Sequence, residues 1–127
     1  MLLRVQQLMD ATLMVSAVIR EARPMPQRGK FRLARLHARL EPEFKTINEQ
    51  RNALIRAFDT PDPEHEGQWI VPAEQLAAFN AQWAEIAETV IDVDVAPVPL
   101  ADIDNGPEAN GAIEAHELVV LGDLIAD

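Results

Sequence analysis

The chain has 127 residues, of which 48% are hydrophobic, and this is enough apolar material for one domain with a single core. Disorder along the whole chain is therefore not expected. Cysteine is absent, which excludes disulfides, thiolate nucleophiles and cysteine-based zinc sites. We expect a single domain over residues 1–127.

Charge is divided sharply along the chain. All 11 basic residues lie in residues 1–58 beside five acidic ones, so this part carries a net charge of +6. Residues 59–127 hold the other 16 acidic residues and no basic residue, so this part carries −16. Either the two parts fold on each other and partly neutralise one another, or each faces a partner of the opposite sign.

Residues 2–22 are expected to form an amphipathic helix, because apolar residues recur there with helical spacing. Asp10 offers another start for this helix as an N-cap, with a short strand before it. Arg4 and Asp10 interrupt the apolar run too early for a signal sequence or a membrane span. Pro24 and Pro26 then end the helix and begin a connector.

Residues 30–58 have the clearest helical pattern of the chain. The apolar stripe of this helix consists of Leu33, Leu36, Leu40, Phe44, Ile47, Leu54 and Phe58. Pro42 lies inside it and removes the backbone hydrogen bond to the carbonyl of residue 38. We therefore expect either a kink near Leu40 or a second helix that starts with Pro42 in its first turn.

The segment DTPDPEHEG, residues 59–67, is expected to be a solvated turn between the basic and the acidic part. Residues 68–72 predict a short strand, and a helix follows from Pro72. Residues 89–95 alternate between apolar and acidic side chains, which predicts a half-buried strand. The two strands flank one helix, which is consistent with a small βαβ unit or a split strand pair.

Residues 97–111 are expected to be a loop, and residues 112–127 a short terminal helix or an extended tail that docks its apolar side chains. The aromatic residues expected in the core are Phe44, Phe58, Trp69, Phe79 and Trp83. Trp69 and Trp83 would stack the strand on the helix that follows it.

The predicted fold class is α+β and mostly helical, with about three main helices and a small two- or three-stranded sheet. Within the single domain, residues 1–58 form a basic helical part, and residues 59–127 form an acidic α+β part with its tail.

No motif of the sequence indicates catalysis or metal binding. HExxH, GxSxG and glycine-rich phosphate loops are absent, and the single serine, Ser16, lies in a predicted helix. The run that starts at Asp102 is similar to a calcium loop, but Gly106, Pro107 and Ile113 occupy positions that require other residues. We therefore expect a protein that is not an enzyme, with no catalytic residues, no metal site and no cofactor.

The basic residues Arg28, Arg32, Arg35 and Arg39 fall on one face of the predicted helix. Such a face suits nucleic acid or an acidic protein surface. We identified no exposed aromatic residue between them, and the net charge of −10 repels phosphate at long range. Direct nucleic-acid binding is therefore not favoured. The acidic side of the candidate interaction surface consists of Asp92, Asp94, Asp102 and Asp104.

Four short motifs follow one another within about residues 28–100: LEPEF at 40–44, RNALI at 51–55, Val71-Pro72 before a helix, and ETVIDVDV at 88–95. Together they resemble a family of short tailed-bacteriophage proteins. That family has no established catalytic residues, and its members tend to be encoded among late tail or morphogenesis genes. The resemblance implies a phage protein and no active site.

We therefore expect a non-catalytic phage protein that acts by protein–protein contact, as a virion accessory or structural component or in tail or head–tail assembly. Its partners would be other phage structural proteins or further copies of itself, with no membrane involved, in the virion or the host cytoplasm. Contacts between copies would join a basic to an acidic surface head to tail. The alternative is an acidic phage-encoded inhibitor that presents carboxylates to a host nucleic-acid-binding or defence protein.

Overall fold

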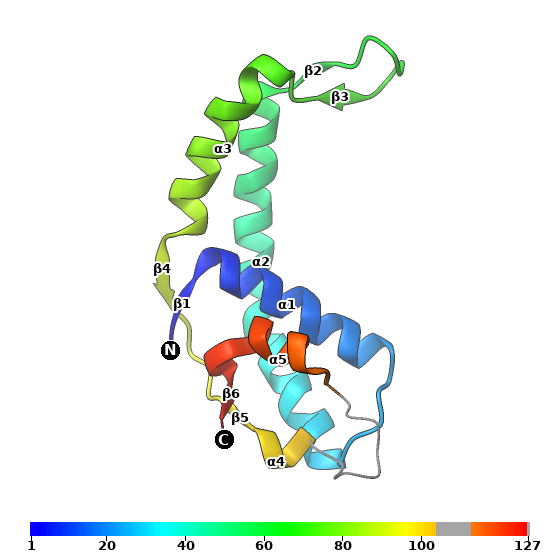
Figure 1. The fold of residues 1–127 in the computed structure, drawn as a ribbon, viewed down its shortest axis with the longest axis vertical. Coiled ribbons are helices and arrows are strands. Elements are labelled where there is room, and N and C mark those ends of the chain that lie inside the picture. The colour runs from blue at the N-terminus through cyan, green and yellow to red at the C-terminus, as the bar shows by residue number, and fades with distance from the viewer. Residues whose placement is uncertain (104–112, 127) are drawn as a thin grey trace.

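The computed structural model describes residues 1–103 and 113–126. Three helices of this range have 15 residues or more: α1 (Val5–Arg20), α2 (Gln27–Phe58) and α3 (Ala73–Ala87). Figure 1 shows α2 running along the length of the molecule, with α1 across its lower half and α3 along its upper half. The fold is α+β and mostly helical, which confirms the predicted fold class.

The first helix differs from both predicted starts. β1 (Leu2–Arg4) precedes it, and the helix begins at Val5. The short strand is therefore present, but Asp10 lies inside the helix and is not its N-cap. Thr12 is buried in the apolar stripe, because its hydroxyl donates a hydrogen bond to the carbonyl of Leu8 at 2.7 Å.

The second helix continues through Pro42, so the predicted helix restart does not occur. Pro42 is exposed, and so is Ala38, whose carbonyl loses its helical partner. Water can satisfy that carbonyl, which lowers the cost of the proline. Leu36 and Leu40 are buried just before it and hold this part of the helix in place by packing.

The strands form three separate two-stranded pairs. β2 (Thr60–Pro61) pairs with β3 (Trp69–Ile70) and β4 (Val90–Asp92) pairs with β1, both antiparallel; β5 (Val98–Pro99) pairs with β6 (Ile125–Ala126), parallel. The predicted βαβ unit is therefore wrong. The strand before α3, β3, pairs with β2, which precedes it in the same hairpin. The strand after α3, β4, pairs with β1 at the start of the chain.

The predicted alternation after α3 is confirmed. Val93 is buried and Ile91 half-buried, whereas Asp92 and Asp94 are exposed. The reason is the pairing with β1, which places one face of this segment on the core.

The segment after β5 is more ordered than the predicted loop. Residues 100–103 form the short helix α4 (Leu100–Ile103), whose last residue is buried. The rest of the predicted loop lies outside the described residues. The terminal helix is confirmed as α5 (Ala115–Leu121), followed by a 3₁₀ turn (Gly122–Leu124). Its side chains Leu121 and Leu124 dock fully into the core.

Residues 44–89 form a projection that we call the arm; we call the other described residues the base. The arm consists of the second half of α2, the β2–β3 hairpin and α3, and Figure 1 shows it extending upward from the base. The largest fully buried side chains all lie in the base: Leu3, Leu8, Val15, Val18, Leu33, Leu40, Ile103, Leu121 and Leu124. The base therefore holds most of the core, which extends into the arm at Ile47.

The arm is packed much more loosely. Phe79 is the single buried residue of α3, and its ring meets that of Phe58 edge to face at 6.1 Å between centroids. The guanidinium carbon of Arg51 lies 5.4 Å from the centroid of Trp83. Trp69 is 62% exposed, so its predicted place in the core, stacked with Trp83, is wrong. It lies in the hairpin, beyond the reach of the core.

Candidate interaction surface

All four arginines of the candidate surface are exposed residues of α2. They follow one another at intervals of three and four residues, which places them on one face of the helix. They belong to the half of α2 that lies in the base. The opposite face of this half carries Leu33 and Leu40, which are buried against the core.

Asp102 holds two of these arginines. Its carboxylate oxygens lie 2.8 Å from Nε of Arg28 and 2.6 Å from Nε of Arg32. The side chain of Asp102 is only 12% exposed, so this candidate acid is used to fasten α4 to α2. The close approach depends on Gly29, because a Cβ there would overlap the carbonyl oxygen of Asp102 and lie 3.2 Å from a methyl group of Ile103.

The other two arginines are much less engaged. Arg39 Nη1 lies 4.0 Å from Asp94 Oδ2, and both side chains are largely exposed, so this pair contributes little. Arg35 has no carboxylate within ion-pair distance in the part of the chain that the structure describes. Its guanidinium carbon lies 5.8 Å from the ring centroid of Phe31.

Phe31 corrects the sequence analysis. It lies between Arg28 and Arg32, and it is 63% exposed, so the basic run does contain an exposed aromatic residue. The signal was available, because Phe31 is two positions from Leu33 and therefore falls outside the apolar stripe of the helix.

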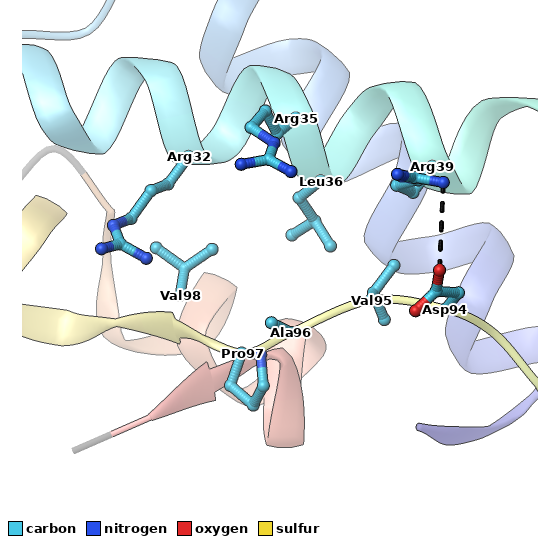
Figure 2. Close-up of a pocket in the computed structure, with 9 residues that line it drawn as sticks. All are labelled: Arg32, Arg35, Leu36, Arg39, Asp94, Val95, Ala96, Pro97 and Val98. Carbon is cyan, nitrogen blue, oxygen red and sulfur yellow. Dashed lines mark ion pairs between the residues drawn. The ribbon is translucent and has the colours of Figure 1, made fainter.

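A pocket of about 320 Å³ lies between this half of α2 and residues 94–98. We call it the arginine groove. Arg32, Arg35 and Arg39 line it from the helix, and Figure 2 shows Leu36 and Val98 pointing into the space between the helix and the extended segment. The groove therefore combines guanidinium groups with apolar side chains.

Of the remaining acidic candidates, Asp94 alone lines the groove among the described residues. Asp92 lies 3.0 Å from the amino group of Met1, beside the β1–β4 pair. Asp94 stands at the edge of the groove opposite Arg39. Asp104 lies outside the described residues. The structure thus brings Asp102 and Asp94 to the arginines, but not Asp92.

A partly buried ion pair that the sequence analysis missed joins the half-buried Arg23 to Glu117. Glu117 is only 4% exposed, and it also accepts a hydrogen bond from the backbone N–H of Glu114 at 2.9 Å. Hydrogen bonding to Arg23 holds the pKa of the Glu117 carboxyl below its ordinary value, despite burial. The available signal was Glu114 three residues before Glu117, which is the spacing of a capping box.

The tip of the arm is an organised loop, which we call the acidic hairpin (residues 59–70). The Asp62 carboxylate accepts a hydrogen bond from the backbone N–H of Glu64 at 2.9 Å and lies 2.9 Å from Nδ1 of His65. Gly67 adopts a φ of +82°, which favours glycine. Glu66 is exposed beside it.

No known protein family, curated protein or solved structure matches the chain. Within residues 1–103 and 113–126, no group of three or more His, Cys, Asp or Glu side chains is placed to hold a metal ion. In that same range, no helix is both long and apolar enough to cross a membrane.

Proposed function

We propose that the chain is a non-catalytic protein that acts by contact with other proteins, as a structural or assembly component of a tailed-phage particle. The observation that carries this proposal is the tip of the arm. Trp69 is 62%, Leu76 43% and Ile70 41% exposed, at the end farthest from the core. At this position these exposed side chains contribute little to the packing of the fold.

The chemistry of the tip supports a protein partner. Tryptophan supplies a large apolar surface with few rotatable bonds, which is why it is enriched among residues that dominate binding energy. Glu64 and Glu66 are exposed in the same hairpin, so an apolar anchor stands beside charged groups. Protein interfaces combine an apolar centre with a polar rim in this way.

The resemblance of residues 28–100 to short tailed-phage proteins favours a role in tail or head–tail assembly or as a virion accessory component. On this proposal the partners are other phage structural proteins or further copies of the chain. The protein would then work in the host cytoplasm during assembly or in the finished virion.

A photo-crosslinking experiment tests the proposal. Trp69 is replaced by p-benzoylphenylalanine, and Leu13 of α1, which is 58% exposed, is replaced in the same way as a matched control in the base. Irradiation of infected cells is expected to join the residue-69 variant, and not the residue-13 variant, to a defined protein of the particle. Equal, diffuse crosslinking from both positions would contradict the proposal.

The structure favours the assembly role over the alternative inhibitor. The inhibitor alternative uses Asp92, Asp94, Asp102, Asp104 and Glu108 as carboxylates that imitate phosphates, and the last two lie outside the described residues. Asp102 is instead held by Arg28 and Arg32, and Asp92 lies against the amino group of Met1. Asp92 and Asp94 are both exposed, so the engagement of Asp102 is what weakens the inhibitor alternative.

A further inference from the structure

We propose that the partner of the arginine groove is a second copy of this chain, whose acidic hairpin docks into it. This inference rests on the proposed function and names one of its partners. It would join the tip of one molecule to the base of the next.

The charges of the two surfaces are complementary. The acidic hairpin contains Asp59, Asp62, Glu64 and Glu66 and no basic residue, which gives −4. Residues 28–39 contain five basic residues and no acidic one, and the two nearby carboxylates of Asp94 and Asp102 leave a net charge of +3. Opposite potentials of this kind steer and orient protein association.

The contact has to form between molecules. The hairpin follows the C-terminal end of α2, whereas the arginine groove lies on the N-terminal half of the same helix. Figure 1 shows α2 as one rod between these two ends. A hairpin therefore cannot reach its own groove, and the two charged surfaces of one molecule do not neutralise each other.

The internal contacts leave a matching set of side chains at each end. In the hairpin, Asp62 is engaged within the loop, and Glu64 and Glu66 point outward as exposed residues. At the groove, Asp102 forms ion pairs with Arg28 and Arg32, so Arg35 and the weakly paired Arg39 are the arginines available to a partner. Two carboxylates thus face two guanidinium groups, a pairing that suits forked hydrogen bonds.

Apolar side chains are matched as well. Trp69 and Ile70 are exposed in the hairpin, and Phe31 is exposed beside the groove. The groove is lined by the half-buried Val95 and the exposed Pro97, above the buried side chains Leu36 and Val98. A docked hairpin would cover Trp69 while its carboxylates meet the arginines at the rim.

Because the two surfaces differ, the contact joins unlike faces and repeats from copy to copy. Such head-to-tail contacts give a ring when the rotation closes and an open filament when it does not. Ion pairs at the rim weaken as salt is added, so the assembly should be salt-dependent.

Sedimentation velocity of the full chain at low and high salt is the first measurement. The wild type is expected to associate at low salt and to dissociate at high salt. Glu64→Gln/Glu66→Gln and Arg35→Gln/Arg39→Gln should each weaken association by about 10-fold or more. The charge-matched controls are Glu85→Gln/Glu88→Gln and Arg4→Gln/Arg20→Gln, all at exposed positions, and they should associate like the wild type.

A charge exchange then tests the specific pairing. Glu64→Lys/Glu66→Lys and Arg35→Glu/Arg39→Glu should each fail to self-associate, because like charges would meet. Mixed at equal amounts they should associate again, since every hairpin then finds a groove of the opposite sign. Circular dichroism of each variant confirms that it is folded before mixing. Failure of the folded mixture to associate would overturn the pairing.

Three further outcomes would also overturn this inference. A wild type that stays monomeric at every salt concentration, while Trp69 still crosslinks to another protein, removes self-association and leaves the proposed function standing. A monomeric wild type that shifts a labelled DNA duplex, with the shift lost in Arg35→Gln/Arg39→Gln, assigns the groove to phosphate instead. If the control variants weaken association as much as the test variants, the contact lies elsewhere.

Discussion

The base and the arm share one helix and one apolar stripe, and yet they use it differently. In the base, Leu33 and Leu40 of α2 are 1% and 0% exposed. In the arm, Leu54 and Phe58 of the same stripe are only half-buried. The difference comes from what lies against the helix: α1 and α4 pack on it in the base, whereas α3 alone accompanies it in the arm.

The comparison shows that an amphipathic pattern predicts which face of a helix is apolar, but not how deeply that face is buried. A fully buried leucine contributes about 1.5–3 kcal/mol, and a half-buried one contributes proportionally less. Two antiparallel helices with few buried residues hold each other weakly, because isolated helical segments are marginal in water. The arm therefore depends on its continuity with the base through α2.

The largest expected effect on stability comes from truncating a leucine of α2, in the base or in the arm. Leu40→Ala removes a fully buried side chain from the base and should lower the free energy of unfolding by about 2–5 kcal/mol. Leu54→Ala, two heptads later on the same stripe, should cost about 1 kcal/mol, because its surroundings can collapse or admit water. Urea unfolding followed by circular dichroism measures both; equal losses would remove the distinction between base and arm.

The next effect concerns the charged contact of each region. Glu117→Gln breaks the partly buried ion pair with Arg23 in the base and should lower the free energy of unfolding by about 2 kcal/mol at neutral pH. Arg51→Gln removes the stacking of a cation on Trp83 in the arm and should cost about 0.5–1 kcal/mol. Thermal unfolding of the two variants compares them directly.

The pH dependence gives this comparison a second readout. Hydrogen bonding to Arg23 lowers the pKa of Glu117 in the folded protein from its ordinary value of 4.5. The carboxylate therefore stabilises the folded state above pH 4.5, and this stabilisation is lost as the pH falls through the lowered folded pKa. The difference in the free energy of unfolding between the wild type and Glu117→Gln should therefore decrease in that acidic range. A difference that stays constant with pH would show that the variant is destabilised by lost packing.

The smallest difference between the two regions is expected for a pair of glycines. Gly29→Ala forces a Cβ into the backbone of α4 and should cost about 1–2 kcal/mol, since overpacking outweighs the gain in helix propensity. Gly67→Ala, in the acidic hairpin, meets open space but an unfavourable φ, and should cost about 1 kcal/mol. Chemical shifts of Asp102 and Ile103 should move in the first variant and stay in place in the second.

Local patterns predicted much of the fold. The long stripe of α2, the helix after Pro72 and the alternation around Val93 all follow from periodicities that depend on neighbouring residues alone. Strand pairing did not follow, because β4 pairs with β1, about 90 residues away in the sequence. Nothing near residues 69–71 shows that this strand turns back on the loop before it rather than lying beside β4.

The candidate surface was predictable in part for the same reason. The spacing of the arginines places them on one helix face without any knowledge of the fold. Which of them form ion pairs depends on where α4 lies, and the sequence does not show this. Asp102 was therefore expected on an acidic interaction surface, but it forms ion pairs with Arg28 and Arg32. Trp69 was expected in the core because an aromatic residue in a short strand usually packs. The acidic hairpin, whose two strands have two residues each, lies at the tip and has no core to pack on.

The uninterrupted course of α2 through Pro42 makes the helix a spacer of defined length. Its 32 residues span roughly 48 Å at the usual rise per residue. Whatever binds at the hairpin is held at that distance from whatever binds at the base, and a break at the proline would have removed this constraint. Copies joined tip to base would repeat at an interval set mainly by this one helix, so the length of α2 would determine the spacing between copies in the assembly.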